Sequence, residues 1–292
     1  MSLQLVVNVV VLAAIYALVG VGYVVVYRAS RVLNLAHGEL MMVGAYLLVG
    51  TASLFAGSPV VAVLVAALCG LVMGVIVYVA LMRWMTGQTV LAAVLVTIAL
   101  GILLRGLVVL GFTAQQFYPA AMLGWRNQSI EVASGARISA ASAMLLAVTV
   151  VVYGALFLFL RFTRLGIQLR ATGQNALLAA QRGIGLNAVY AFAWGLSTFT
   201  ASIAGMLLAL DSGAEGQMAT IGLKAFPAAL VGGLDSFVGA IVGSIIVAMA
   251  EIAAIQYVNP LLSDVVPFLV LLVVLAVRPW GLFGSREQLD RV

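Results

Sequence analysis

The stretch RVLNLAHGELMMVGAYL, residues 31–47, carries the only histidine of the chain, His37, beside Asn34 and Glu39 at the start of an apolar run. Glu39 would lie in the first turn of a helix, where a negative charge suits the positive end of the helix dipole. Asn34 could cap that helix or bond free backbone groups. Irregular backbone at membrane depth survives only where protein or a water-filled cavity receives its polar groups. Such an interruption can therefore mark a solute path, although a cytoplasmic loop before a capped helix explains it too. In both interpretations His37 is a hydrogen-bonding partner.

A second interrupted segment, LKAFPAALVGGLDSFVGAIVGSII, covers residues 223–246. Pro227 disturbs a helix begun just before it, and a pair of glycines after it allows a tight turn. Paired glycine- or proline-broken segments indicate a midplane site in transporters built from internal repeats, but the similarity between the two halves leaves a repeat open. The residues predicted to line a path are Asn34, His37, Gly38, Glu39, Ala228, Gly232, Gly233 and Asp235.

The sequence shows no arrangement of residues that is typical of a catalytic site or a metal site. The single histidine and the single cysteine, Cys69, lie far apart, and the acidic residues are scattered. No G-x-x-x-x-G-K-[ST] run occurs, so the chain has no phosphate-binding loop. We therefore predict no catalytic residue, no metal site and no cofactor bound by this chain. Any ATP that drives it would be hydrolysed by another subunit.

The composition excludes a soluble protein. Of the 292 residues, 65% are hydrophobic and 8% are charged, whereas soluble domains carry about 25% charged residues. We predict an all-α, polytopic membrane protein in which residues 1–292 form a single transmembrane domain. The net charge of +5 comes from arginines grouped in a few connections, which the positive-inside rule explains better than nucleic-acid binding.

Apolar runs predict eight full transmembrane helices plus a short broken helical segment. The full spans are expected at residues 5–27, 38–57, 59–82, 89–112, 139–160, 189–210, 236–258 and 265–281, and the short one at 219–234. If the short segment also crosses, the chain runs from outside to a cytoplasmic C-terminus, in agreement with Arg278, Arg286 and Arg291 in the tail.

The connections have distinct characters. Residues 161–188 carry four arginines and no acidic residue, so this loop is expected in the cytoplasm. Residues 174–182 read as a short amphipathic helix ended by Gly183 and Gly185, suited to anionic membrane lipid or to a groove in a partner protein. Residues 113–138 then face the periplasm. Their SIEVASGARIS stretch predicts a hairpin around Gly135 or, equally, an irregular loop.

Two charges fall inside predicted spans. Arg105 lies in ALGILLRGLVVLG, where it would extend its guanidinium toward the outer surface or pair inside the bundle. Glu251 lies in IIVAMAEIAAIQYV and should face other helices, as a functional acid or as a helix–helix hydrogen-bond partner.

Four motifs in order along the chain resemble one family. LNLAHGELMMVGAY (33–46), LRATGQNALLAAQRGIGLN (169–187), KAFPAALVGGLDSFVGAIVGS (224–244) and VRPWGLFG (277–284) resemble bacterial branched-chain amino acid ABC transporter permeases, the Liv type. The resemblance implies a pore made with a second, identical or homologous permease, two cytoplasmic ATPase subunits and a periplasmic substrate-binding protein. It implies import of branched-chain or related amino acids across the bacterial inner membrane. The residues expected to contact the ATPase are Arg170, Gln174, Asn175, Arg182, Gly183, Ile184 and Gly185.

Departures from the family pattern leave the substrate open. Leu35 stands where an aromatic residue is common, Pro227 where a small or β-branched residue is common, and Asp235 where glycine is common. Two other classes of function remain alternatives. A secondary transporter driven by an ion gradient would use Glu39 or Glu251 as its coupling acid. A membrane scaffold subunit would bind no small solute.

Overall fold

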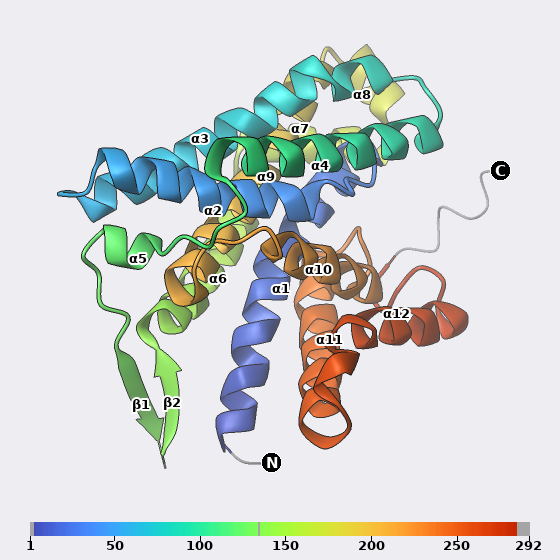
Figure 1. Ribbon diagram of the computed structural model, residues 1–292. Coiled ribbons are helices and arrows are strands. Elements are labelled where there is room, and N and C mark those ends of the chain that lie inside the picture. Colours follow the sequence, from blue (N-terminus) through green and yellow to red (C-terminus); the bar gives the residue numbers. More distant parts are fainter. Residues whose placement is uncertain (1–2, 134, 285–292) are drawn as a thin grey trace.

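The computed structural model describes residues 3–133 and 135–284, which form a helical bundle with one small hairpin (Figure 1). The long helices coincide closely with the apolar runs. The elements are α1 (Leu3–Ser30), α2 (His37–Leu54), α3 (Pro59–Ala80), η1 (Met82–Met85), α4 (Val90–Phe112), α5 (Pro119–Met122), β1 (Ser129–Ala133), β2 (Ala136–Ser139), α6 (Ala140–Phe162), α7 (Arg164–Gln174), α8 (Ala176–Gln181), α9 (Leu186–Ser212), α10 (Met218–Gly232), α11 (Phe237–Tyr257), η2 (Pro260–Asp264) and α12 (Val266–Val277).

Six of the described helices, α1, α3, α4, α6, α9 and α11, are long and apolar enough to cross a membrane. The expected count of eight full spans is therefore not confirmed. The run at 38–57 becomes α2, whose first turn holds His37 and Glu39 and lowers its hydropathy. The run at 265–281 becomes the short α12, because Arg278 ends the helix.

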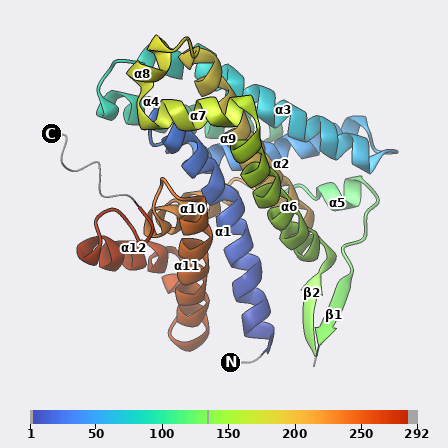
Figure 2. The same ribbon diagram turned by 180° about the vertical axis from the view of Figure 1, so that it is seen from behind.

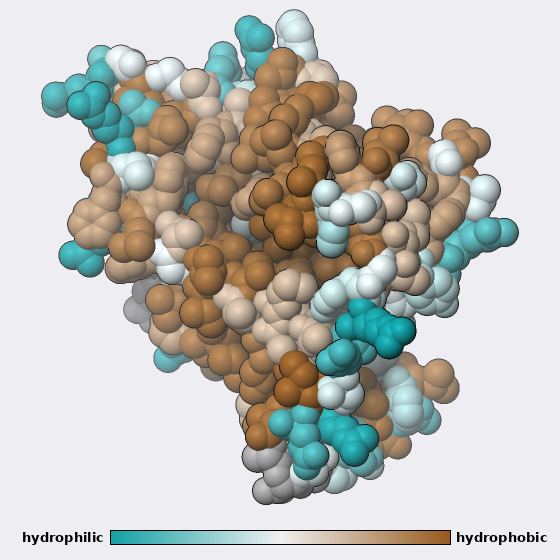
Figure 3. All heavy atoms as spheres, turned by 90° about the vertical axis from the view of Figure 1, so that its left-hand side faces the viewer, coloured by the Kyte–Doolittle hydropathy of each residue, from teal (hydrophilic) through white to brown (hydrophobic). Residues whose placement is uncertain are grey.

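The interior of the bundle is formed by α1 and α9, most of whose residues are buried. By contrast, only a minority of the residues of α3, α4 and α6 are buried. Figure 3 shows one side of the molecule as a largely hydrophobic surface, with hydrophilic residues mainly toward its edges. An apolar surface of this extent fits contact with hydrocarbon rather than water.

The bundle has two distinct ends, which Figures 1 and 2 both show. The hairpin end holds β1 and β2, whose antiparallel pairing around Gly135 confirms the predicted hairpin. The start of α1 lies there, since Gln4 Nε2 donates to the Arg137 carbonyl. The opposite end, called here the α7–α8 end, holds the end of α1, where Arg31 Nη2 donates to the Gly173 carbonyl at 2.9 Å.

Helix α10 runs between these two ends. Its start follows Ala214, which is bridged to Phe117 near the hairpin end. Beyond its end, Phe237 lies under the Arg28 guanidinium at the α7–α8 end, 4.9 Å from guanidinium carbon to ring centroid. The prediction of a break at Pro227 is wrong, because α10 is continuous through that residue. The chain reverses at Gly233, whose φ of +103° favours glycine.

Close helix crossings depend on glycines that face backbone. A Cβ atom on Gly205 of α9 would collide with the Met41 carbonyl of α2, and one on Gly38 would collide with α10 at Gly222 and Ala219. Small residues allow helices to approach this closely in membranes. These crossings hold α2 between α9 and α10.

We predict that Gly205→Val lowers stability by about 1–3 kcal/mol, because the added side chain forces α2 and α9 apart. Thermal unfolding of the purified protein in detergent measures the effect. Gly154→Val is the matched control, since open space surrounds Gly154 on α6. Equal melting temperatures for the two variants would contradict the packing assigned to this crossing.

Candidate functional site

The chain leaves helical geometry between α1 and α2. Arg31 has a φ of +56°, which is unusual for a residue other than glycine. Asn34 is buried, and its Oδ1 accepts a hydrogen bond from the Ala36 N–H at 3.1 Å. The Leu35 N–H donates to Thr97 Oγ1 of α4 at 3.1 Å. Asn34 thus bonds free backbone, one of the two roles expected of it, while the residue that caps α2 is Ala36.

His37 is completely buried where α1, α2, α9 and α10 meet. Its Nε2 atom lies 3.1 Å from the Val19 carbonyl oxygen, and Nδ1 lies 3.5 Å from Ser197 Oγ. The ring packs on Tyr23 with centroids 4.4 Å apart. The predicted hydrogen-bonding role of His37 is confirmed.

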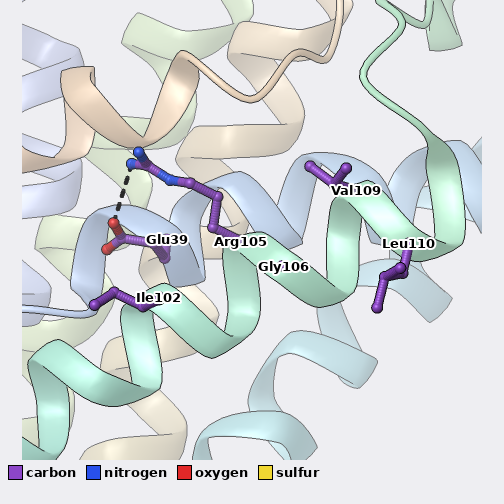
Figure 4. Close-up of a pocket in the computed structure, with 6 residues that line it drawn as sticks. All are labelled: Glu39, Ile102, Arg105, Gly106, Val109 and Leu110. Atoms are coloured by element: carbon purple, nitrogen blue, oxygen red, sulfur yellow. Dashed lines mark hydrogen bonds and ion pairs between the residues drawn. The ribbon is translucent and has the colours of Figure 1, made fainter.

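Glu39 and Arg105 form an ion pair between α2 and α4, with Arg105 Nη2 3.2 Å from Glu39 Oε1 (Figure 4). The two alternatives for Arg105 are thereby resolved in favour of pairing. The Arg105 side chain is 53% exposed and the Glu39 side chain 18%. A cavity of about 650 Å³ opens beside the pair, lined otherwise by Ile102, Gly106, Val109 and Leu110 of α4.

A second ion pair is buried between α10 and α11. Lys224 Nζ donates to Glu251 Oε1 at 2.8 Å, and the Tyr16 hydroxyl of α1 donates to Glu251 Oε2 at 2.5 Å. Lys224 also lies 3.1 Å from Asp264 Oδ1, which is exposed. Glu251 therefore makes helix–helix hydrogen bonds, one of its two expected roles. Sequence reasoning missed Lys224 and Tyr16 as its partners; a lone lysine in an apolar run was the available signal.

The residues predicted at 228–235 lie in helix contacts. A Cβ atom on Gly232 would collide with Gly239 of α11, and Gly233 packs against Gly284. Ala228 is fully buried, and Asp235 interacts electrostatically with Arg28. Of the eight predicted path residues, Glu39 is the one that lines a cavity described above. A role in a solute path stays a prediction for all eight.

The segment predicted to contact an ATPase consists of two helices rather than one. Residues 164–174 form α7, which the sequence interpretation left as loop, and Gln174 ends it. Asn175 starts α8 instead of lying inside a helix, because its Oδ1 accepts from the Leu178 N–H at 3.0 Å. The Gly183 φ of +82° ends the segment as predicted. Ile184 is partly buried, and the exposed members of the predicted set are Arg170, Gln174, Asn175, Arg182, Gly183 and Gly185.

Comparison with known proteins gives one consistent result. Residues 5–275 match the family model of the permease component of the branched-chain amino acid transport system. The chain is similar to the high-affinity branched-chain amino acid transport system permease proteins LivH of Salmonella typhimurium and of Escherichia coli K12. Each is 32% identical over 99% of this chain and 97% of the relative. The corresponding protein BraD of Pseudomonas aeruginosa is 29% identical over 99% of this chain and 98% of its own.

We predict that Lys224→Met destabilises the protein by about 3–5 kcal/mol, because it leaves the Glu251 carboxylate buried without its cation. The double variant Lys224→Met/Glu251→Met should recover most of that loss, since no charge is then left unpaired. Asp264→Asn is the control and should cost at most about 1 kcal/mol, as expected at an exposed pair. Denaturant or thermal unfolding in detergent measures the stability of these three variants. Equal stability of Lys224→Met and the double variant would contradict the assignment of Glu251 as a buried, paired carboxylate.

Proposed function

The chain belongs to the family of branched-chain amino acid transport permeases, and from this premise we propose that it is the membrane-spanning subunit of an ATP-driven importer. Separate ATPase subunits hydrolyse ATP, because the sequence holds no phosphate-binding loop. The substrates are branched-chain or related hydrophobic amino acids, as the printed names of the relatives suggest. A periplasmic binding protein delivers them, and a second permease completes the pore.

The observation that carries this proposal is the exposed α8 at one end of the bundle. Leu177 and Leu178 are 69% and 57% exposed, although they are apolar. Arg170 and Arg182 flank them, also exposed. A short helix that presents exposed apolar side chains, with basic residues around them, fits a groove in a partner protein. The arginines favour a cytoplasmic location for the same end, where ATP is available.

The contacts of α7 provide a route from an ATPase to the interior. Arg31 Nη2 donates to the Gly173 carbonyl at 2.9 Å, and Gly173 packs against the Arg28 carbonyl. A push on α8 therefore reaches the turn between α1 and α2 through α7. Movement of α2 displaces Glu39 and its cavity, and alternating access follows when the site opens first to one side and then to the other.

In this arrangement the protein lies in the bacterial inner membrane. The hairpin end faces the periplasm, so residues 113–138 are available to the binding protein. The α7–α8 end and residues 277–284 face the cytoplasm. Arg286 and Arg291, two of the tail arginines used to predict this orientation, lie outside the described residues.

Both acids that an ion-driven transporter could use are paired with cations. Glu39 pairs with Arg105 and Glu251 pairs with Lys224. In each case the ion pair would have to break before the carboxylate could bind a transported ion. This pairing supports coupling to ATP rather than to an ion gradient.

Co-purification tests the proposed assembly. The chain, expressed with the ATPase and second permease genes of its own genome, should elute with both after mild detergent extraction. ATP hydrolysis by the complex in vesicles should rise when leucine and the binding protein are added. The proposal would be contradicted if the chain eluted alone and if leucine with the binding protein did not raise ATP hydrolysis.

We predict that Arg182→Glu or Gly183→Pro uncouples transport while the chain still inserts. Arg182→Glu reverses a charge in the proposed contact, and proline cannot adopt the φ of +82° found at Gly183. Uptake of labelled leucine should fall at least about tenfold, the equivalent of roughly 1.4 kcal/mol in coupling. Arg83→Glu, a reversal of an exposed charge in η1 that lies outside both α7–α8 and residues 113–138, is the matched control and should leave uptake unchanged. Normal uptake by both Arg182→Glu and Gly183→Pro would show that the coupling assignment is wrong.

A further inference from the structure

We propose that Arg105 and Glu39 bind the carboxylate and the ammonium group of an aliphatic amino acid, with its side chain against the apolar wall of α4. This inference rests on the proposed function and names the site at which the substrate is held. It adds Arg105 to the predicted path, which included Glu39 and not its partner.

The chemistry of the ion pair matches a zwitterion. In an α-amino acid the ammonium and the carboxylate are attached to one carbon, so a matching site needs an acid and a base side by side. Arg105 Nη2 and Glu39 Oε1 are 3.2 Å apart. Within the described part of the chain, the guanidinium donates one hydrogen bond, to Glu39. Arginine has five donors in a planar fork, so others remain for a carboxylate in the two-pronged geometry that arginine prefers.

The position of Arg105 argues against a purely structural pair. It lies in α4 between Ile102 and Leu110, which are 72% and 84% exposed. A charge within an apolar membrane span is costly in contact with lipid, and such residues usually face a bundle interior or a water-filled cavity. The Lys224–Glu251 pair meets that rule by burial. The Glu39–Arg105 pair is not enclosed by the protein. It meets the same rule when water and a polar solute reach the pair.

The cavity has the walls for an aliphatic side chain. It is a depression on the outer face of α4 that is open to the surroundings rather than enclosed. Apart from the pair, its lining is Ile102, Val109 and Leu110 with Gly106 between them. A Cβ atom on Gly106 would meet nothing within 4 Å. Glycine is not needed there for packing, and its lack of a side chain leaves room beside the guanidinium (Figure 4).

Cysteine labelling tests the site directly. The importer, assembled with its partner subunits, carries Cys69→Ser and Gly106→Cys in open membrane fragments that expose both faces. The rate of modification by a charged thiosulfonate reports water at the site, because the thiolate forms in water and not in lipid. Leu107→Cys is the matched control, exposed on the same helix but not part of the cavity lining.

We expect rapid modification of Gly106→Cys and far slower modification of Leu107→Cys. Saturating leucine should slow the first reaction by about tenfold or more, whereas 4-methyl-2-oxopentanoate, without an ammonium, and isopentylamine, without a carboxylate, should not. Adding Glu39→Gln should remove the protection, since loss of a hydrogen bond to a charged group weakens binding by about tenfold to a hundredfold.

The two proposals fail in different ways. If the wild-type importer takes up leucine but leucine leaves the labelling rate of Gly106→Cys unchanged, the site is elsewhere. If Gly106→Cys is as unreactive as Leu107→Cys, the cavity is dry and the inference is also overturned. Protection by leucine in the fragments, together with no ATP-driven uptake by the same importer in closed vesicles, would retain the site and reject the importer.

Discussion

Hydrocarbon supplies neither hydrogen bonds nor counterions, so every polar group at membrane depth must find its partner inside the protein. This constraint explains where the charges of the bundle lie. Glu251 is enclosed by Lys224 and Tyr16 and ties three helices together. Glu39 finds Arg105 across α2 and α4, yet this pair opens onto a cavity. Similar chemistry thus serves packing in one place and, in our proposal, recognition in the other, and exposure separates the two.

The same constraint governs the backbone. The non-helical residues between α1 and α2 are accommodated because Asn34, Thr97 and Gly173 accept or stabilise their polar groups. Glycines then let α2 pack directly on α9 and α10. In the proposed coupling, this turn and α2 would move together and carry a push from α7 to the cavity beside Glu39.

The sequence allowed prediction of what local patterns determine. Helix positions followed from apolar runs, and Gly135 and Gly183 marked turns correctly. Pairings over long sequence distances could not be predicted, because periodicity gives the face of a helix and not its neighbour. Arg105 and Lys224 therefore gained partners only in the structure. Pro227 was overinterpreted, since tertiary contacts keep α10 helical around it, and α7 was missed because its weakly apolar composition resembles a loop.

The most direct test of the account is the energy source of transport. Proteoliposomes that contain the chain, its partner permease and the ATPases, with the binding protein on the substrate-facing side, are given labelled leucine. The account predicts accumulation only when ATP and the binding protein are both present. Accumulation by the chain alone under a proton or sodium gradient, unaffected by ATP, would contradict it.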